Sequence, residues 1–506
     1  MYTEYILKMA PKVLTQVDRD KHSKYFGDCD RNHWHLKLCD FSSAILQQAG
    51  LTLALLYTVD FPGNRFYQKD VVREWAIGTV YYWKSIQLKD GSFNGFAPTA
   101  FSLYAMCEVY KRLGMQDDSI LQAFGKTAHY LSAHIEKKAC NQELASVTAF
   151  YSAYTVLKED WILDGMNKKL DSILKLQSKE GWFPEYDGVD IGYLSVSLDM
   201  LAEYYWMSRD EKVMEPLNKV IDFLKYFVHP DGSAGGEYAL GNSVCFLTNG
   251  LQVMSNLGNQ DAEAVFQFLF QDSQKDFYFL DAVDDRYFSH YLLHSFLRAV
   301  EKEKDGQRKS VSEAKLPFAY EQERYFAEAG LLSCTRGDMY MIVGASKGGV
   351  CRIFKGENEC FADYGYRVKL DEENVAATNW QSPDYQTEYE AYRMKITGCM
   401  SMVKQKNTGI VKRRIITADK KTDISFERMI FLQKDKIVID DLISSPEAVC
   451  LECADSFSLS QAASGKFFTL TDIGCHSRTQ YPDTTNIRIQ RIFHFDSEQM
   501  EENVLA

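Results

Sequence analysis

The stretches Ile86-Gln-Leu-Lys-Asp-Gly-Ser-Phe93 and Leu176-Gln-Ser-Lys-Glu-Gly-Trp-Phe183 share one pattern, and Val228-His-Pro-Asp-Gly-Ser-Ala234 repeats it. Each contains the end of a helical pattern and then an acidic residue followed by glycine. Glycine readily adopts the left-handed conformation that closes a helix. Each stretch therefore predicts a turn between two helices.

These turns recur along the first 330 residues. The acidic-glycine pairs begin at Asp90, Glu180 and Asp231, and weaker junctions lie at Asn141 and around 281–285. The resulting steps of about 40 to 50 residues fall in the range of stacked helical hairpins. The repeat predicts a solenoid or a closed ring of helix pairs.

The two helices of each pair differ in character. The helices before the turns are amphipathic, whereas those after them are apolar on all sides, which predicts burial. The outer helices are expected at 68–88, 118–136, 166–176, 215–227 and 262–271, and the inner ones at 41–57, 99–113, 144–157, 190–206, 242–257 and 286–300. Six inner helices alternating with outer ones predict an (α/α)6 toroid.

The pattern changes after a polar segment. Beyond residue 332 the hydrophobic period becomes two, as in Met339-Tyr-Met-Ile-Val343 and Lys436-Ile-Val-Ile-Asp440. Many short strands with short turns predict an antiparallel β-sandwich. We therefore expect a toroid over 1–304, a linker over 305–332 and a β-sandwich over 333–506, an α+β multidomain chain.

Composition narrows the function. The chain has 506 residues and a net charge of −13, with no basic region suited to nucleic acid. No segment approaches the roughly 18 apolar residues of a membrane span. The twelve scattered cysteines and the absence of a signal-peptide pattern at the N-terminus predict a cytoplasmic protein. The high aromatic content of 13% suits saccharide binding, although a large aromatic core explains it as well.

The order of short motifs along nearly the whole chain resembles the heparinase II/III-like family of bacterial polysaccharide-cluster proteins. The motifs are Arg31-Asn-His-Trp-His35, Asp90-Gly-Ser-Phe-Asn94, Gly181-Trp-Phe-Pro-Glu-Tyr186 with Asp190-Ile-Gly-Tyr193, Asp231-Gly-Ser233 with Gly236-Glu-Tyr238, Asp284-Asp-Arg-Tyr287 and Ser346-Lys-Gly-Gly349. The resemblance implies a helical toroid followed by a β-sandwich, and a polysaccharide lyase acting on uronic acids. One departure is that Asn94 leads directly into Gly95-Phe-Ala-Pro98 and a helix, where the family has a longer polar segment.

The loops that enter the inner helices should converge on one mouth, where the helix N-termini favour carboxylates and sulfates. β-Elimination from a uronide needs a base for the C5 proton, a group that neutralises the carboxylate and an acid for the leaving oxygen. C5 epimerisation shares the first step. The cluster around 284–290 is the richest, so we expect Tyr287 or His290 to be the base and Arg286 to hold the carboxylate. The remaining substrate-binding candidates are Asn32, His33, Trp34, His35, Asn94, Glu185, Tyr186, Asp190, Glu237, Tyr238, Asn242 and Asp285.

Three classes of function remain open. The first is a lyase or C5 epimerase acting on a uronate-containing poly- or oligosaccharide. The second is a glycoside hydrolase that uses paired carboxylates near Glu185 and Asp190, and the third is a non-catalytic saccharide-binding scaffold. A terpenoid cyclase is disfavoured, since no Asp-x-Asp-Asp run is present. We expect no metal, because His33-Trp-His35 lacks a third ligand at suitable spacing, and no other cofactor.

Overall fold

The computed structural model describes residues 2–31, 43–186, 188–240, 243, 245–271, 288–305, 314–408, 413–455, 477–481, 484–497 and 499–505. The chain forms two compact units. Unit 1 comprises residues 1–187, 192–225 and 245–314, and unit 2 comprises residues 188–191, 226–244 and 315–506. Each unit is described by itself below.

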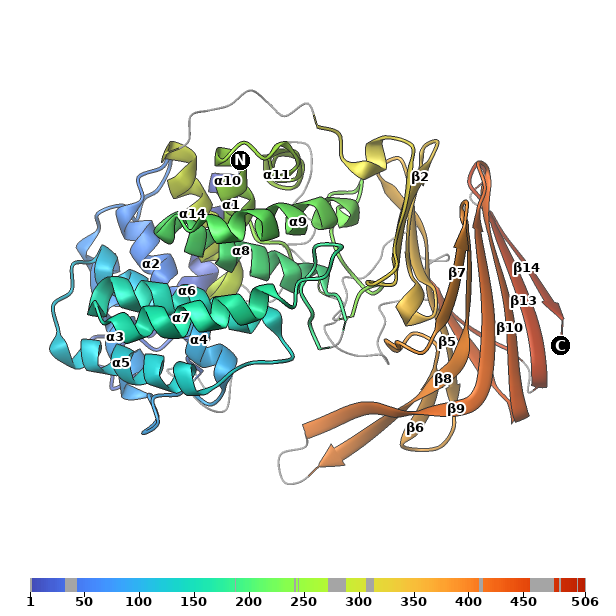
Figure 1. Ribbon diagram of the computed structural model, residues 1–506, viewed down its shortest axis with the longest axis horizontal. Helices are drawn as coiled ribbons and strands as arrows, with labels where there is room; N and C mark the ends of the chain where they lie inside the picture. Colours follow the sequence, from blue (N-terminus) through green and yellow to red (C-terminus); the bar gives the residue numbers. More distant parts are fainter. Residues whose placement is uncertain are drawn as a thin grey trace. The chain divides into compact units, whose positions relative to one another are not determined.

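Unit 1 is built from inner and outer helices in alternation (Figure 1). Inner helices such as α4 and α6 are buried on all sides over most of their length, whereas outer helices such as α5, α7 and α9 bury one face. The inner helices are α2 (Ala49–Thr58), α4 (Phe96–Arg112), α6 (Cys140–Leu157), α8 (Ile191–Ser208), α10 (Asn249–Asn256) and α14 (Leu293–Asp305), the last preceded by the π-helical turn η5 (Phe288–Leu292). The outer helices are α3 (Asp70–Ser85), α5 (Asp118–Ala133), α7 (Asp160–Leu174), α9 (Met214–Leu224), α11 (Gln260–Phe266) and α1 (Tyr2–Leu14).

Helix α1 takes an outer position that the sequence pattern did not predict. The ring of Tyr2 packs edge-on against Phe266 of α11 and lies beside Phe296 of α14. The N-terminal segment therefore supplies the outer partner of α14. The other helices follow the predicted pattern, and the predicted α/α architecture is confirmed.

The acidic-glycine turns share one geometry. The Leu88 N–H donates to Ser92 O at 3.0 Å, and the Ser178 N–H donates to Trp182 O at 2.9 Å. Gly91 and Gly181 have φ values of +89° and +108°. A Cβ atom would lie 2.3 Å from a carbonyl oxygen of α5 at Gly91 and 2.2 Å from one of α9 at Gly181. Glycine is required here because each turn presses against the next outer helix.

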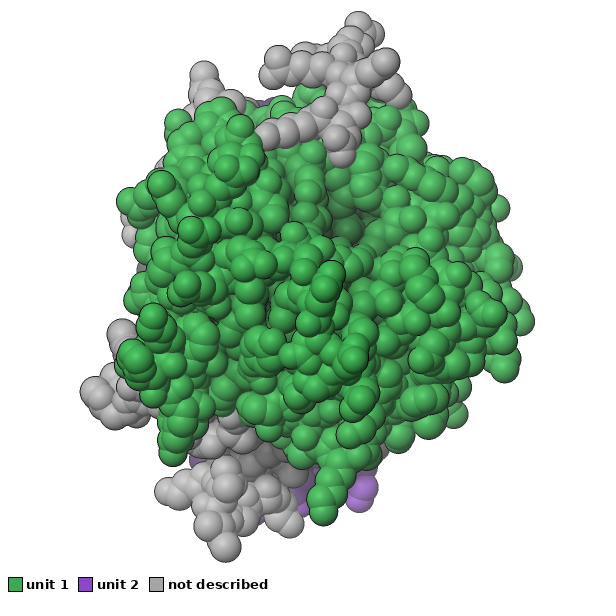
Figure 2. Space-filling model, turned by 90° about the vertical axis from the view of Figure 1, so that its left-hand side faces the viewer, with its two compact units in different colours: residues 1–187, 192–225, 245–314 green, residues 188–191, 226–244, 315–506 purple. Residues whose placement is uncertain are grey.

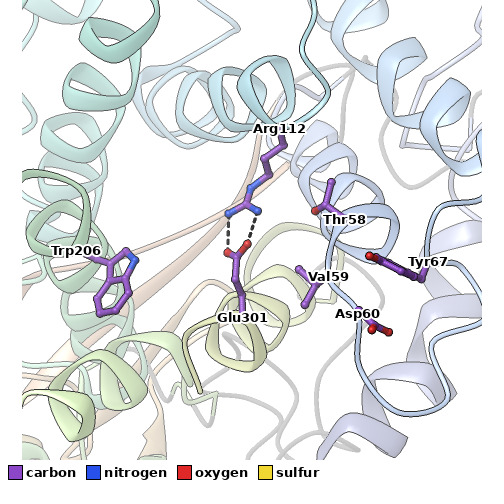
Figure 3. A pocket seen from close by; sticks show the side chains of 7 residues that line it. All are labelled: Thr58, Val59, Asp60, Tyr67, Arg112, Trp206 and Glu301. Atoms are coloured by element: carbon purple, nitrogen blue, oxygen red, sulfur yellow. Dashed lines mark hydrogen bonds and ion pairs between the residues drawn. The ribbon is translucent and has the colours of Figure 1, made fainter. Parts of the chain in front are cut away.

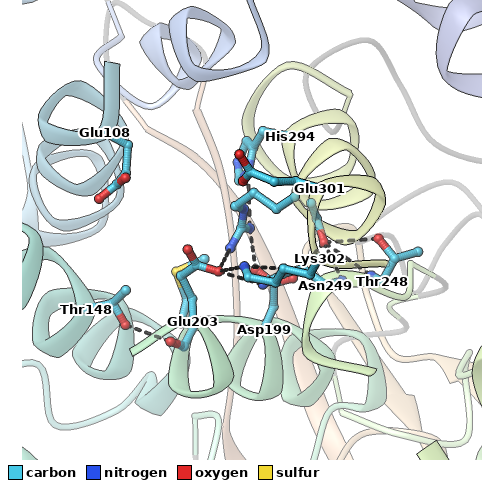
Figure 4. Close-up of polar contacts among 12 residues, drawn as sticks. Glu108, Thr148, Asp199, Glu203, Thr248, Asn249, His294, Glu301 and Lys302 are labelled. Carbon is cyan, nitrogen blue, oxygen red and sulfur yellow. Dashed lines mark hydrogen bonds and ion pairs between the residues drawn. The ribbon is translucent and has the colours of Figure 1, made fainter. Parts of the chain in front are cut away.

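A buried polar network links the inner helices (Figure 4). Arg298 of α14 donates to Asp199 of α8 at 2.5 Å and lies 3.2 Å from Glu203. Lys302, one turn further along α14, bonds to Glu203 and donates to Asn249 Oδ1 at 2.7 Å. All five residues are buried. The interior of unit 1 is therefore polar and charged as well as apolar.

Unit 2 is an antiparallel sheet folded into two layers (Figure 1). Neighbouring strands follow the order β1-β2-β3-β4-β5-β6-β8-β9-β10-β13-β14, while β7 pairs with β8, and β11 pairs with β5 and β12. The strands are β1 (Gln322–Phe326), β2 (Leu331–Arg336), β3 (Met339–Gly344), β4 (Val350–Lys355), β5 (Asn358–Lys369), β6 (Asn374–Ala377), β7 (Gln386–Glu390), β8 (Arg393–Thr408), β9 (Arg413–Leu432), β10 (Lys436–Val449), β11 (Leu451–Asp455), β12 (Ser477–Gln480), β13 (Thr484–His494) and β14 (Gln499–Leu505).

Alternate residues of these strands fill the space between the layers. Met341 and Ile353 of one layer belong to the same buried cluster as Ile430, Ile439 and Phe493 of the other. The predicted β-sandwich is therefore confirmed. Strand β1 lies within the segment 305–332 that we expected to be a linker, and the predicted strand at 467–471 lies outside the described residues.

No helix in the described part of the chain is both long and apolar enough to cross a membrane.

Candidate functional site

The N-terminal ends of the inner helices of unit 1 bring several predicted residues together. The loop before α6 pairs with the segment before α8 through a short bridge between Ala139 and Glu185. The Tyr186 N–H donates to Lys138 O at 2.5 Å, and the Cys140 N–H donates to Pro184 O at 3.2 Å. These bonds hold the entrances of two neighbouring inner helices side by side.

Glu185 caps helix α6 from this neighbouring segment. Its two carboxylate oxygens accept hydrogen bonds of 2.7 Å each from the backbone N–H and the side-chain amide of Asn141. The side chain is 1% exposed. A carboxylate at a helix N-terminus satisfies free N–H groups and complements the helix dipole. Glu185 thus fixes the start of α6 at the entrance to the inner helices.

Tyr291 of η5 lies near these groups. Burial raises the pKa of its phenol well above the ordinary value, and the nearby Tyr193, Cys245, Glu185 and Tyr186 raise it further. The phenol is therefore neutral over the physiological range and is a potential proton donor. Its ring packs edge-on against Phe101 of α4.

Tyr186 is more than half exposed, and its backbone is in the left-handed region at φ +49°. A non-glycine residue in this region is uncommon, and strain of this kind collects at functional sites. The Gln142 side-chain amide lies 3.5 Å from its hydroxyl. Tyr186 therefore presents an accessible phenol beside the buried Tyr291.

Two histidines continue from this mouth into the interior. His290 is 8% exposed and packs edge-on against the ring of Tyr291. One turn further, His294 bonds through Nε2 to the His290 carbonyl at 2.9 Å and lies 3.2 Å from Arg298. Burial, assisted by Arg298, lowers the pKa of His294 to about 3. His294 is therefore neutral and joins the mouth to the buried network.

In unit 2, the predicted residues Asp190 and Glu237 lie near a lysine that was not predicted. Lys347, in the short turn between β3 and β4, is buried and donates to Ala239 O at 3.0 Å. Burial lowers the pKa of Lys347 to about 8, although Glu237 and Asp190 act in the opposite direction. A lysine with a pKa in this range can carry or exchange a proton near neutral pH. Asp190, Glu237 and Lys347 thus form one charged cluster.

Tyr238 belongs to a hydrogen-bonded chain in the same unit. Its hydroxyl lies 3.0 Å from His229 Nε2, and His229 Nδ1 lies 2.7 Å from Ser233 Oγ. Ser233 donates to Asp231 at 2.7 Å, so its oxygen accepts from Nδ1 and Tyr238 donates to Nε2. Tyr238 and His229 are fully buried, and burial holds the pKa of His229 well below its usual range. This chain fixes the loop that carries Glu237.

The predicted site residues that the structure describes therefore form two clusters and one separate position. Glu185, Tyr186 and His290 meet around Tyr291 in unit 1, and Asp190, Glu237 and Tyr238 cluster in unit 2. Asn94 is exposed in the turn before α4, at φ +60°. The others, which remain predictions, lie outside the described residues: Asn32, His33, Trp34, His35, Asn242, Asp285, Arg286 and Tyr287.

Sequence reasoning missed Tyr291 and Lys347. Tyr291 directly follows the favoured His290, but it lies just outside the cluster at 284–290 from which the candidates were chosen. The segment becomes π-helical at Phe288–Leu292, which changes the faces that a regular α-helix would present. Lys347 was not among the predicted site residues, although Ser346-Lys-Gly-Gly349 was among the motifs of the family resemblance.

Among the described residues, no group of three His, Cys, Asp or Glu side chains is placed to hold a metal ion. The expectation that no metal or cofactor is needed stays a prediction.

Comparison with known proteins gives a likeness of fold. No family model matches the sequence, and no curated protein does. A Paenibacillus xanthan lyase superposes with a TM-score of 0.53 at 12% identity, over 89% of this chain and 46% of the lyase. A Streptomyces coelicolor A3 chondroitin AC lyase in complex with chondroitin sulphate gives 0.50 at 9% identity, over 89% of this chain and 71% of that lyase. This chain thus spans less than half of the xanthan lyase, and its fold is similar to the folds of these two proteins.

Proposed function

We propose that this protein is an enzyme of the heparinase II/III-like family that acts on a uronate-containing poly- or oligosaccharide. The proposed reaction is β-elimination or C5 epimerisation, both of which begin with removal of the C5 proton. The proposed setting is the cytoplasm, which suits a short saccharide or a lipid-linked precursor better than an extracellular polymer. The lyase fold supports the substrate class, and the residues at the mouth of unit 1 support the reaction type.

The observation that carries the proposal is the group of phenols around Tyr291. Tyr186 and Tyr193 lie close enough to influence its pKa, and His290 packs against its ring. Elimination needs an acid for the leaving oxygen, and a neutral buried phenol supplies one. We assign this role to Tyr291, because its proton stays bound over the whole physiological pH range.

The base and the carboxylate-binding group come from the same segment of the chain. His290 and Tyr287 remain the proposed bases, and Arg286 remains the proposed partner of the substrate carboxylate. Helix N-termini at this mouth assist by favouring an anionic group. Removal of the C5 proton leaves negative charge on the uronate carboxylate, and a cation there stabilises it.

The geometry of Glu185 weighs against the hydrolase alternative. Both of its oxygens accept hydrogen bonds from Asn141 and are thereby engaged at the N-terminus of α6. A carboxylate held in this way serves as a helix cap. A catalytic acid or nucleophile must instead reach the glycosidic oxygen or the anomeric carbon.

The test is the substitution Tyr291→Phe, which removes one hydroxyl and keeps the ring in place. Uronate oligosaccharides are offered to both proteins, and ultraviolet absorbance reports the unsaturated uronide, while NMR reports an epimerised one. We expect a rate reduction of about 10²- to 10⁴-fold. Tyr154→Phe is the matched control, because this half-buried tyrosine lies near the opposite end of α6.

Three outcomes contradict the assignment. An active wild type whose Tyr291→Phe variant keeps full rate removes Tyr291 from the mechanism. Products without ultraviolet absorbance and without epimerisation, abolished by Glu185→Gln, indicate the hydrolase. Binding of uronate oligosaccharides without any turnover indicates the non-catalytic scaffold, which the short segment after Asn94 also permits.

A further inference from the structure

A pocket lies at the other end of the inner helices of unit 1, where these helices finish. It has a volume of about 530 Å³ and is lined by Thr58, Val59, Asp60, Tyr67, Arg112, Trp206 and Glu301 (Figure 3). This volume falls within the usual range for small-molecule sites, about 300–1,000 Å³. Figure 2 views unit 1 from this end, and the surface there is hollowed. None of these residues belongs to the groups described above.

The polar groups of the pocket are held in place before any ligand arrives. The Arg112 guanidinium makes two parallel hydrogen bonds of 2.7 Å to the Glu301 carboxylate. Such a bidentate pair has a fixed geometry. Asn64 braces the loop that carries Asp60 and Tyr67, since its amide donates to Leu56 O at 2.9 Å and to Val59 O at 2.8 Å.

The lining carries both donors and acceptors. Asp60 and Glu301 supply carboxylate oxygens, and the last carbonyls of helices ending here add further acceptors. Arg112 and the Trp206 indole N–H supply donors, and Figure 3 shows the indole nitrogen on the side of Trp206 that faces the Arg112–Glu301 pair. The ring systems of Trp206 and Tyr67 and the side chain of Val59 supply apolar surface.

The charges in and beside the pocket bear on whether its ligand is charged. Two carboxylates accompany a single guanidinium, and the helix C-termini add partial negative charge. This negative charge is offset by Arg209 and Lys302, which lie 4.3 Å and 5.7 Å from the Trp206 ring centroid. The charges therefore favour neither a uronate or another anion nor a cation.

We propose that this pocket binds an uncharged sugar residue, at a site separate from the mouth that holds Tyr291. Sugar hydroxyl groups donate and accept hydrogen bonds together, which matches the mixed lining. Their C–H faces pack on aromatic and aliphatic side chains. The proposal does not depend on the reaction assigned to the other end.

The test is ligand-observed NMR and calorimetry with methyl glycosides of glucose, galactose and mannose. Methyl glucuronide and methyl glucosaminide serve as charged probes of the same size. We expect at least one neutral glycoside to bind saturably and more tightly than either charged probe. Asp60→Ala and Trp206→Ala should each weaken this binding at least tenfold.

Two control variants are matched to these. Asp164→Ala removes an exposed carboxylate from α7, and Trp161→Ala removes a partly exposed indole from the same helix, both outside the pocket. Both should leave the affinity unchanged. If Trp206→Ala fails to fold, the affinity of the Asp60→Ala variant still tests the proposal, because Asp60 is exposed. The proposal is overturned if no neutral glycoside binds, if a charged probe binds more tightly, or if Asp60→Ala keeps the wild-type affinity.

Discussion

The two ends of the inner helices of unit 1 use charged and aromatic side chains differently. At the N-terminal end, the Glu185 carboxylate caps α6, and the phenol of Tyr291 is buried near other titratable groups. At the C-terminal end, the Arg112–Glu301 pair stays partly exposed and borders an open pocket. The buried, neutral phenol at the N-terminal end is suited to proton transfer. The open pocket at the C-terminal end is suited to ligand binding.

Between the two ends lies the charged network of Arg298, Asp199 and Glu203. A buried charge that loses its partner keeps its desolvation cost, whereas a partly exposed one regains water. Substitutions that remove a charged partner should therefore cost more stability in the interior than at the pocket. The following predictions test this difference.

The largest effect is expected from Asp199→Ala. It leaves the fully buried Arg298 without its partner at 2.5 Å and should lower the free energy of unfolding by about 3–5 kcal/mol. Denaturant titration followed by circular dichroism measures the change. Asp164→Ala, on an exposed face of α7, is the control and should have almost no effect. A loss below about 1 kcal/mol for Asp199→Ala would mean that the network contributes little to the fold.

The second effect concerns pH. The pKa of His294 is about 3 in the folded protein, because of burial and the nearby Arg298, against about 6.5 in an unfolded chain. Between these values the unfolded chain binds more protons, so stability is complete above pH 6.5 and falls as the pH drops toward 3. His294→Gln should flatten this acid slope, whereas His22→Gln, at an exposed histidine, should not. Equal slopes for all three proteins would contradict the buried, neutral state of His294.

An intermediate effect is expected at the N-terminal end. Glu185→Gln replaces one acceptor oxygen by a donor facing Asn141, which should lower the free energy of unfolding by about 1–3 kcal/mol. If Glu185 only caps α6, kcat on a uronate substrate should change little below the unfolding temperature. A large loss of kcat with unchanged stability would reverse this interpretation.

The smallest effect is expected at the pocket. Glu301→Gln weakens a partly exposed ion pair and should lower the free energy of unfolding by about 0.5–1 kcal/mol. Because exposed pairs are screened by salt, the difference from wild type should shrink at high ionic strength. A loss as large as that of Asp199→Ala would remove the contrast between the interior and this end.

Sequence patterns predicted the architecture because it follows from local rules. The repeated Asp-Gly and Glu-Gly turns need glycine for steric reasons, and period-two hydrophobicity identifies the strands. Helix α1 escaped prediction because its partners, Phe266 and Phe296, are distant in the sequence. Lys347 escaped for a related reason, since its buried setting depends on Ala239, Asp190 and Glu237.

The sequence predicted the region in which the candidate residues meet better than it predicted their individual roles. The sequence indicated the N-terminal ends of the inner helices, and Glu185, Tyr186 and His290 do meet there. It did not indicate that Glu185 serves as a cap for α6, because that bond joins residues 44 positions apart. Tyr291 was likewise not predicted, because the sequence pattern indicates a regular helix and not the π-helical turn at Phe288–Leu292.

We propose that this protein removes the C5 proton of a uronate. The most direct measurement incubates uronate oligosaccharides with the protein in D₂O and follows the H5 signal by NMR. We expect H5 to be lost in the presence of wild-type protein, with an unsaturated product if elimination follows or with solvent deuterium at C5 if epimerisation follows. Cleavage products that retain H5, or substrates that bind and keep H5 unchanged through long incubation, would contradict the claim.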